Sequence, residues 1–477
     1  MSRESTQISK IGVIAGGVAG LSTAVNLLDK AKDAGVELHV TVFEKGATTG
    51  GNLQTVCRDG WQIEKGPNGF LDNEPATLRL VERLGLQDQL VSSNDAARRR
   101  FLLVNGRIEQ IPDAPLAFVR SRMLSVGAKL RIAGELFIPA RKDLGRAAED
   151  PTTDETVAQF GNRRLGHSFT EIMLDPMVKG IFGGDVHLLS LAATFPRMVE
   201  LEKNYGGLFR AMISLTRNRK KKVDAGPTGK LISFQGGMAT LVDELARVLK
   251  DDPRATLLTS TDVQTIQQSK GCLHITTNER TYGPFSSVVE AAPAHAAALH
   301  LGKLDLGLSK CLAQIPFAPM VVVALGFPRD AVIHDLDGFG MLIPSRERKM
   351  LLGSLWTSSI FPGRVPASQV LIRCMAGGAA NPQIMELDDT TIIQTVLDEL
   401  RPLLGLQGLP AITELVRHEK AIAQYIPGHL ARLQEIDRVV QTFPGLFLTG
   451  SSYRGISVNA CVKEAEQVAQ DVFERLV

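Results

Sequence analysis

The first fifty residues follow an order that few folds can accommodate: a strand, a glycine turn, a helix, a second strand and an acidic residue. Residues 11–14 predict a short buried strand, residues 15–20 a turn, and the following residues to about 28 an amphipathic helix. A second strand is expected over 38–43, directly before Glu44. In such a unit the glycines let a pyrophosphate approach the helix N-terminus, and the carboxylate accepts a hydrogen bond from an adenosine ribose. The order therefore predicts a dinucleotide-binding unit.

The spacing within this unit supports the prediction, with one departure. Glu44 lies 24 residues after Gly20, and Gly50 and Gly51 follow shortly afterwards. The alternative is an ordinary glycine-rich turn, which would not require this context. Ala15 occupies the position at which the pattern has its first glycine, and we expect its methyl group to crowd the turn.

Composition limits the class of protein. A chain of 477 residues exceeds the usual size of a single core, so at least two domains are expected. A net charge of +2 argues against nucleic acid as the main partner. The five cysteines are scattered without a CxxC pair, so we expect no zinc site, no disulfide framework and a reduced compartment. The polar residues 1–10 leave no room for a signal peptide, and no apolar run is long enough to span a membrane.

Three separated segments read as parts of one nucleotide-binding domain. They are residues 1–90, residues 226–299 and residues 436–477, and the second contains an alternating hairpin candidate over 273–282. Two inserts, 91–225 and 300–435, are assigned to substrate and surface functions. The expected fold is therefore a mixed α/β fold with a discontinuous Rossmann-like domain.

The first insert contains a stretch with an unusual charge distribution. Residues 116–142 are helical in period and carry six lysines and arginines, among them Arg120, Arg122, Lys129 and Arg131, against the single acid Glu135. One interpretation is a pair of surface helices packed on the core. The other is an interfacial helix on an anionic lipid surface. A second basic run, 217–222, is expected to be a solvated loop.

Motifs spread over the whole chain resemble one family. They are, in order, EKGPNGFL at 64–71, GIFGGD at 180–185, FQGGM at 234–238, GFGMLIP at 338–344, FPGR at 361–364, QYIPGH at 424–429 and GSSYRG at 450–455. Together they resemble the FAD-dependent protoporphyrinogen oxidases of haem and chlorophyll synthesis, a branch of the flavin amine oxidase superfamily.

The resemblance implies a fold and an activity. The FAD domain would be of the p-hydroxybenzoate-hydroxylase type, with 91–225 as a helical membrane-binding and substrate-access domain and 300–435 as the substrate-binding domain. FAD would oxidise protoporphyrinogen IX to protoporphyrin IX, a six-electron reaction with molecular oxygen as acceptor and hydrogen peroxide as product. Coproporphyrinogen III, oxidised to coproporphyrin III, is the alternative substrate. The protein would be cytoplasmic and peripherally attached to a membrane through about 116–142. The sequence leaves open whether it forms a homodimer.

The resemblance also implies roles for individual residues. Arg100 would pair with a substrate propionate, because a guanidinium fork suits a carboxylate. Leu342 and Trp356 would sandwich the tetrapyrrole, and plain core packing is the alternative for Trp356. His429 is expected to be structural. The positions expected to bind FAD are Ala15, Gly16, Gly17, Val18, Ala19, Gly20, Glu44, Lys45, Asn52, Gly66, Pro67, Asn68, Gly69, Val263, His418, Ile456, Ser457 and Val458.

Several positions depart from the family pattern near the expected FAD path. Besides Ala15, a histidine at 418 replaces a tryptophan, and an acid at 290 enters a strand that should be buried. An unpaired buried carboxylate is costly, so Glu290 requires a partner, a shifted pKa or exposure. Ala423, Ala460 and Glu464 are further departures. As a set they predict weakened or unusual FAD binding.

Two other functions remain open from the sequence. An amine oxidase-like flavoenzyme could use Tyr425 and Tyr453 as aromatic residues beside the flavin. A non-catalytic homologue could bind porphyrin without turning it over. The chemistry assigns no catalytic side chain, because the flavin accepts the hydride.

Overall fold

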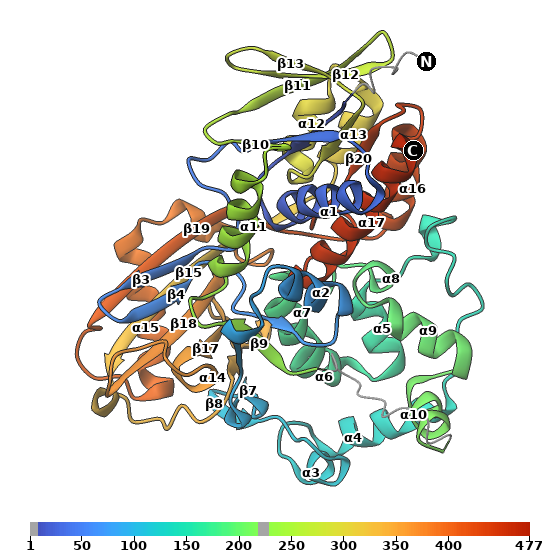
Figure 1. The fold of residues 1–477 in the computed structure, drawn as a ribbon. Helices are drawn as coiled ribbons and strands as arrows, with labels where there is room; N and C mark the ends of the chain where they lie inside the picture. The colour runs from blue at the N-terminus through green and yellow to red at the C-terminus, as the bar shows by residue number, and fades with distance from the viewer. Residues whose placement is uncertain (1–7, 218–228) are drawn as a thin grey trace, which may run out of the picture.

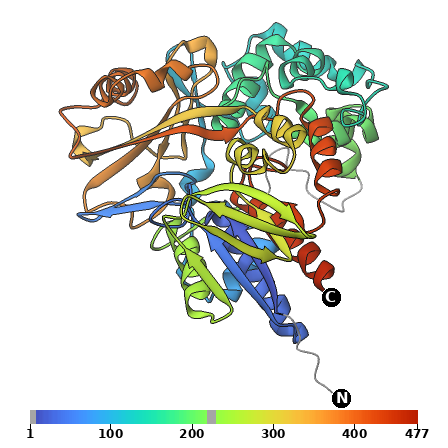
Figure 2. The ribbon, with the colours of Figure 1, turned by 90° about the horizontal axis from the view of Figure 1, so that it is seen from above.

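The computed structural model describes residues 8–217 and 229–477, which form three lobes of a mixed α/β fold (Figures 1 and 2). One lobe is built around a parallel sheet, one around a larger and mostly antiparallel sheet, and one consists of helices. The basic run 217–222, except for its first residue, lies outside the described residues. None of the described helices combines the length and the apolar character that a membrane crossing requires.

The first lobe has a five-stranded parallel sheet with the order β10-β2-β1-β14-β20. Its strands are β1 (Ser9–Ile14), β2 (Leu38–Phe43), β10 (Ala255–Leu258), β14 (Ser287–Glu290) and β20 (Leu446–Leu448). Three segments far apart in the sequence therefore contribute to one sheet. Valine and isoleucine fill its central strands because both faces of a parallel sheet are covered.

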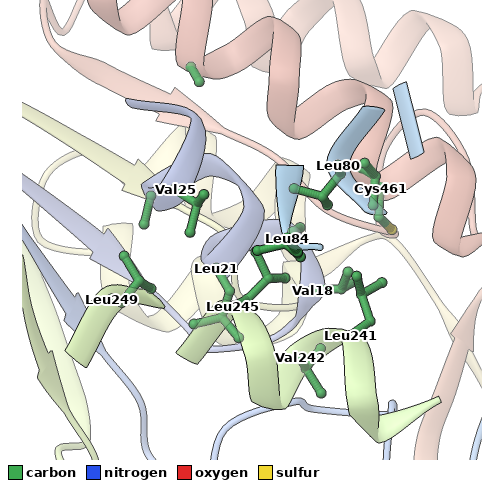
Figure 3. Close-up of a cluster of buried hydrophobic side chains, with 14 of the residues drawn as sticks. Val18, Leu21, Val25, Leu80, Leu84, Leu241, Val242, Leu245, Leu249 and Cys461 are labelled. Carbon is green, nitrogen blue, oxygen red and sulfur yellow. The ribbon is translucent and has the colours of Figure 1, made fainter. Parts of the chain in front are cut away.

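Helices cover one face of this sheet and enclose the largest core of the protein. They are α1 (Val18–Ala34), α2 (Pro75–Arg83), α11 (Ala239–Asp251) and α17 (Val458–Leu476). Leu21 of α1 and Leu245 of α11 are completely buried in this core, and Cys461 of α17 is buried in the same core (Figure 3). Gly35 ends α1 in the left-handed conformation with φ 66°, which suits a residue without a side chain.

The opposite face is covered by a small sheet and three helices. They are β11 (Val263–Ser269), β12 (Cys272–Thr277), β13 (Thr281–Phe285), α12 (Ala294–Leu301), α13 (Leu306–Ala313) and α16 (His429–Val440). The alternating segment 273–282 forms the antiparallel hairpin β12–β13, as its period predicts.

The second lobe has a seven-stranded sheet with the order β19-β15-β18-β17-β16-β7-β8. Its strands are β7 (Phe101–Val104), β8 (Arg107–Gln110), β15 (Phe317–Pro328), β16 (Gly340–Leu342), β17 (Leu351–Trp356), β18 (Gln369–Gly377) and β19 (Ile412–Ala423). Helix α15 (Asp389–Leu404) packs on one face. The hairpin β3 (Thr55–Arg58) and β4 (Trp61–Glu64) packs on the other.

The expected boundary at residue 91 does not coincide with this architecture. β7 pairs with β16 in parallel, so residues 101–110 belong to the seven-stranded sheet rather than to the helical lobe. A small sheet with the order β5-β9-β6 is formed by β5 (Phe70–Leu71), β9 (Leu231–Phe234) and β6 (Leu90–Ser92), and η1 (Gln87–Gln89) and η2 (Asp95–Arg98) flank β6 in the chain. The connections between strands of the seven-stranded sheet contain η6 (Arg329–Ala331), η7 (Ser345–Glu347), α14 (Thr357–Ile360) and η8 (Pro382–Glu386).

The third lobe consists of short helices around a buried ionic network. The elements are α3 (Pro115–Arg120), α4 (Val126–Ala133), η3 (Gly134–Phe137), η4 (Pro151–Thr153), α5 (Val157–Arg164), α6 (His167–Phe169), η5 (Thr170–Leu174), α7 (Asp175–Phe182), α8 (Leu191–Thr194), α9 (Pro196–Tyr205) and α10 (Leu208–Arg217). Arg164 forms an ion pair with Glu135, and both side chains are completely buried. Arg163 joins the same network through Glu202 at 2.7 Å. Fully paired charges of this kind fix one arrangement of the lobe, and removal of one partner would be costly.

The basic stretch 116–142 is less regular than its period suggests. It folds as two short helices and a 3₁₀ turn rather than as one helix. Lys129 Nζ donates to the carbonyl oxygens of Val119 (2.8 Å) and Ser121 (2.5 Å). Arg131 donates to three carbonyl oxygens at the end of α5. These two cations therefore satisfy helix ends within the lobe, whereas Arg120 and Arg122 are exposed.

Candidate functional site

The glycine turn lies at the carboxyl end of β1 and enters α1. Ala15 has φ 77°, a left-handed conformation in which a methyl group is unfavourable. A side chain at Gly20 would stand 2.0 Å from the carbonyl oxygen of Ala15, so only glycine fits there. The space in front of Gly17 is open, with nothing within 4 Å of the position that a methyl group would take. The turn is therefore tight on its inner side and accessible on its outer side.

The N-terminus of α1 has the properties of an anion site. Among the described residues, no side chain caps this helix, and Gly17 at the N-cap is extended with φ −78° and ψ 177°. Val18 and Ala19 follow in the first turn. A helix N-terminus presents free amide groups and a positive partial charge, which suit a phosphate. The residues present thus fit the pyrophosphate of a dinucleotide such as FAD.

Glu44 closes the other side of this turn. Its carboxylate accepts hydrogen bonds from the backbone amides of Gly16 (2.7 Å) and Gly46 (2.6 Å). Carboxylate oxygens have further acceptor capacity, which leaves room for a ribose hydroxyl. Lys45 pairs with Asp262 at 3.2 Å, and this places Val263 at the same end of the site.

The loop between β2 and the hairpin β3–β4 lies against the glycine turn. Gly50 donates to the carbonyl oxygen of Gly16 at 2.7 Å, and Asn52 is exposed beside it. A side chain at Gly66 would stand 2.0 Å from the carbonyl oxygen of Asn52. Residues 64–69, which we call the strap, therefore lie directly against the loop that supports the turn.

Asn68 is the unusual residue of the strap. Both its Nδ2 and its Oδ1 atoms are buried, and neither has a hydrogen-bond partner among the described residues. Buried polar atoms are normally paired, so an amide with a free donor and a free acceptor is suited to a ligand that offers the complementary pair. Pro67 and Gly69 flank it and are half-buried.

The loop before α17 is held next to the same turn. The Tyr425 hydroxyl donates to the carbonyl oxygen of Ser451 at 2.8 Å and accepts from the amide of Gly455 at 3.0 Å. Ser457 caps α17 by accepting from the amide of Ala460 at 3.1 Å. Ile456, Ser457 and Val458 thus form the start of a second helix that faces the N-terminal unit, because α17 packs on α1.

Glu290 has the partner that the sequence requires. It is completely buried, and its carboxylate accepts from the amide of Ala292 (2.9 Å) and from Nδ1 of His300 (2.7 Å). Burial alone would lower the pKa of His300, but the charge and hydrogen bond of Glu290 outweigh it, so that pKa is raised.

The other departures are also accommodated. Glu464 accepts from Arg454 (3.1 Å) and from the amide of Gly450 (3.3 Å), while burial raises its pKa. His418 lies within hydrogen-bond distance, 2.9 Å, of the Lys65 carbonyl oxygen. Ala460 stands where a side chain at Gly455 would collide.

The residues expected to bind the tetrapyrrole lie in the sheet lobe, but they do not all share one face. Arg100 is exposed, with its guanidinium 5.4 Å from the centre of the Phe339 ring. Leu342 contacts Gly180 of α7 and is half-buried. Trp356 is completely buried and packs 5.1 Å from the ring of Phe101.

The pairing of β16 with β17 fixes these orientations. Leu342 pairs with Gly353, and Trp356 lies three residues further along β17, so the two side chains point to opposite faces. Trp356 belongs to the core under α15. The structure therefore does not bring Leu342 and Trp356 together around one flat ligand, and it gives Trp356 the core-packing position. Leu355, which sequence reasoning missed, shares the face of Leu342.

His429, Tyr425 and Tyr453 of the QYIPGH and GSSYRG motifs are buried and do not face an open site. His429 is buried, donates through Nε2 to the carbonyl oxygen of Tyr453 at 2.8 Å and stacks on Tyr425 at 4.1 Å. Burial lowers the pKa of His429 to about 4, so the ring is neutral near pH 7. Tyr425 and Tyr453 are 2% and 1% exposed. Neither tyrosine offers an open ring face of the kind that the amine oxidase alternative needs.

Known proteins similar to this chain agree on one family. The family described as flavin containing amine oxidoreductase matches residues 18–473. The chain is 29% identical to a coproporphyrinogen III oxidase from Bacillus subtilis (strain 168), over 97% of this chain and 98% of the relative. It is 28% identical to a mitochondrial protoporphyrinogen oxidase from Nicotiana tabacum, over 98% of this chain and 95% of the relative.

Solved structures share the fold. A protein described as a candidate protoporphyrinogen oxidase from Exiguobacterium sp. 255-15 superposes with a TM-score of 0.81 at 23% identity, covering 99% of both chains. Cyclohexylamine oxidase from Brevibacterium oxydans IH-35A superposes with a TM-score of 0.70 at 18% identity, covering 98% of this chain and 99% of that chain. The fold is thus common to enzymes with different substrates, and the substrate has to be argued from the site.

Proposed function

Because the chain belongs to the flavin containing amine oxidoreductase family, we propose that it is an FAD-dependent oxidase whose substrate is a porphyrinogen. The observation that supports FAD as the cofactor is the uncapped N-terminus of α1, which lies between the glycine turn and Glu44. The relatives named protoporphyrinogen oxidase and coproporphyrinogen III oxidase, which match almost the whole chain, support the substrate class.

In this proposal each part of the site has a defined task. Residues 15–20 hold the pyrophosphate, Glu44 accepts from the adenosine ribose, and the strap with the start of α17 borders the isoalloxazine ring. When bound, FAD supplies the hydride acceptor. The protein binds and orients the porphyrinogen and excludes water, with Arg100 receiving a propionate and Leu342 packing on the macrocycle.

The test uses purified protein and two substrates. The flavin spectrum of the protein is recorded first. Protoporphyrinogen IX and coproporphyrinogen III are then supplied separately with oxygen, and porphyrin fluorescence and hydrogen peroxide are measured. We expect a yellow protein that forms porphyrin, with protoporphyrinogen IX as the first candidate. A yellow protein that oxidises neither substrate would contradict the substrate class, and a colourless protein that binds porphyrin would indicate a non-catalytic homologue.

We also propose peripheral membrane attachment through α3, α4 and η3. These elements lie at the edge of the helical lobe that is far from the five-stranded sheet (Figure 1). Leu130 and Phe137 are 68% and 85% exposed, and Arg120 and Arg122 of the same segment are also exposed. Exposed apolar side chains next to cations are the ingredients of interfacial binding. The poor solubility of a porphyrin product gives such attachment a physical rationale.

A further inference from the structure

The strap is held by side chains of the seven-stranded sheet through three successive carbonyl groups. Arg373 Nε donates to the carbonyl oxygen of Glu64 at 2.9 Å, and Arg373 Nη2 donates to that of Gly66 at 2.5 Å. His418 Nε2 lies 2.9 Å from the carbonyl oxygen of Lys65. A carbonyl oxygen only accepts, so Nε2 of His418 carries the proton.

Arg373 and His418 reach the strap from the same face of the sheet. Arg373 of β18 pairs with Ala324 of β15, and His418 of β19 pairs with Met320 of the same strand. Ala324 and Met320 are four residues apart, so both side chains share one face, the face on which β4 packs. The strand register is consistent with all three hydrogen bonds to the strap. Arg373, His418 and the strap therefore form one structural unit.

Arg373 is buried where it bonds to the carbonyl groups of the strap. Arg373 is 5% exposed, and burial lowers its pKa to about 10, although the nearby charge of Glu64 opposes this. The carboxylate of Glu64 is itself occupied by Thr55 (2.8 Å), the amide of Met238 (3.0 Å) and Arg364 (3.4 Å). The guanidinium of Arg373 is thus directed at backbone carbonyl groups, for which its planar fork is suited.

We propose that Arg373 and His418 form a clamp through which the seven-stranded sheet positions the strap at the cofactor site. The inference deepens the proposed function and rests on it for the identity of the cofactor. The strap borders the loop that supports the glycine turn, and it carries Asn68, whose amide atoms are buried without a partner in the described part of the chain. The clamp therefore sets where Asn68 stands. Both residues are positioning residues, since they act through the strap.

Hydrogen–deuterium exchange of the strap tests the clamp directly. Arg373→Lys keeps the charge but loses the fork, and His418→Phe keeps a ring but loses the donor. We expect amide exchange in peptides covering residues 62–70 to accelerate about tenfold in each variant, as the loss of one charged or neutral hydrogen bond predicts. His418→Gln retains a donor and should restore slow exchange. Unchanged exchange in both loss variants would overturn the clamp, whether or not the protein contains flavin.

The matched control is Arg329, which also donates to two backbone carbonyl oxygens of the same lobe. It bonds to Val332 (2.7 Å) and His334 (3.1 Å) and pairs with Asp335 at 4.0 Å, and none of its contacts within the described residues is with the strap. Arg329→Lys should leave exchange in residues 62–70 at the parental rate. Faster strap exchange in this variant as well would mean that the lobe loosens as a whole, and would overturn a local clamp.

The flavin gives the second readout. In Arg373→Lys and His418→Phe we expect FAD affinity to fall about tenfold and the midpoint potential of bound flavin to shift, while Arg329→Lys retains both parental values. Faster strap exchange with unchanged FAD affinity and potential would overturn the positioning role and leave only a structural contact. A parent protein that binds no FAD would instead overturn the proposed function, and the exchange measurement would still decide the clamp.

Discussion

Nδ1 of His300 lies 2.7 Å from a carboxylate oxygen of Glu290, beneath the carboxyl end of the parallel sheet. Because the pKa of His300 is raised in the folded protein, protonation and folding favour each other. The pair therefore contributes stability that is complete below the ordinary histidine pKa of about 6.5 and is lost as pH rises through the higher folded value. We expect the urea midpoint of the parent to exceed that of His300→Gln most at pH 6 and least at pH 9. A constant difference across this range would contradict the charge pair.

Glu44→Ala should weaken FAD binding by about 1.5–3 kcal/mol, because a charge-assisted hydrogen bond to the ribose is lost. The change also removes the acceptor for the amides of Gly16 and Gly46. The dissociation constant is measured by quenching of flavin fluorescence. Glu37→Ala, at an exposed position before β2, is the control and should bind FAD as the parent does. Equal affinity in Glu44→Ala would remove Glu44 from the site.

Ala15→Gly should stabilise the protein. Ala15 has φ 77°, and a left-handed alanine costs about 1–2 kcal/mol that glycine does not incur. The gain is partly offset by the greater freedom of glycine in the unfolded chain, so a net gain of roughly 0.5–1 kcal/mol is expected. Thermal denaturation with and without FAD measures it. A loss of FAD affinity would show that the methyl group contributes to the turn.

Arg100→Ala should raise KM for a porphyrinogen about tenfold with little change in bound flavin, because the propionate contact is made in the ground state. Arg99→Ala is the adjacent control, since Arg99 is engaged by Asp337. Steady-state kinetics of both variants with one substrate provide the measurement. If the two variants behave alike, Arg100 is one of a basic cluster rather than a specific contact.

Membrane attachment should depend on two of the basic residues more than on the other two. Each cation near an anionic surface contributes about 1 kcal/mol, so Arg120→Gln with Arg122→Gln should reduce cosedimentation with anionic vesicles markedly. Raising the salt concentration should have the same effect. Lys129→Gln with Arg131→Gln should mainly lower the melting temperature, because these side chains bond to helix ends. Equal partition of parent and first variant into neutral and anionic vesicles would reduce the segment to ordinary surface helices.

The sequence predicts best what depends on neighbouring residues. The unit from β1 to Glu44 is one uninterrupted segment of the chain, so its order and spacing can be recognised in the sequence without knowledge of the fold. The orientation of Trp356 is different, because it depends on the pairing of Leu342 with Gly353, which no local pattern reveals. The partner of Glu290 is His300, which lies ten residues further on, after a turn, in the mostly apolar helix α12.

The clamp on the strap illustrates the same limit. An arginine at 373 and a histidine at 418 are separated from the strap by about three hundred residues or more, and nothing in their own strands indicates where they point. For Arg373 the available signal is a charge inside the apolar strand β18, since it requires a buried partner, whereas β19 is charged around His418 and gives no such signal.

The parallel sheet has a further consequence for synthesis. β14 lies between β1 and β20, and α17 fills the core against α1, so a strand and a helix made long after β1 and α1 complete the sheet and the core that those elements begin. β10 and β14 complete the pairing of β2 and β1, but β14 keeps an open edge and α1 an uncovered apolar face until β20 and α17 have been synthesised. During this interval the nascent protein is prone to aggregate. Under the proposed function, FAD can therefore bind only after α17 has been synthesised.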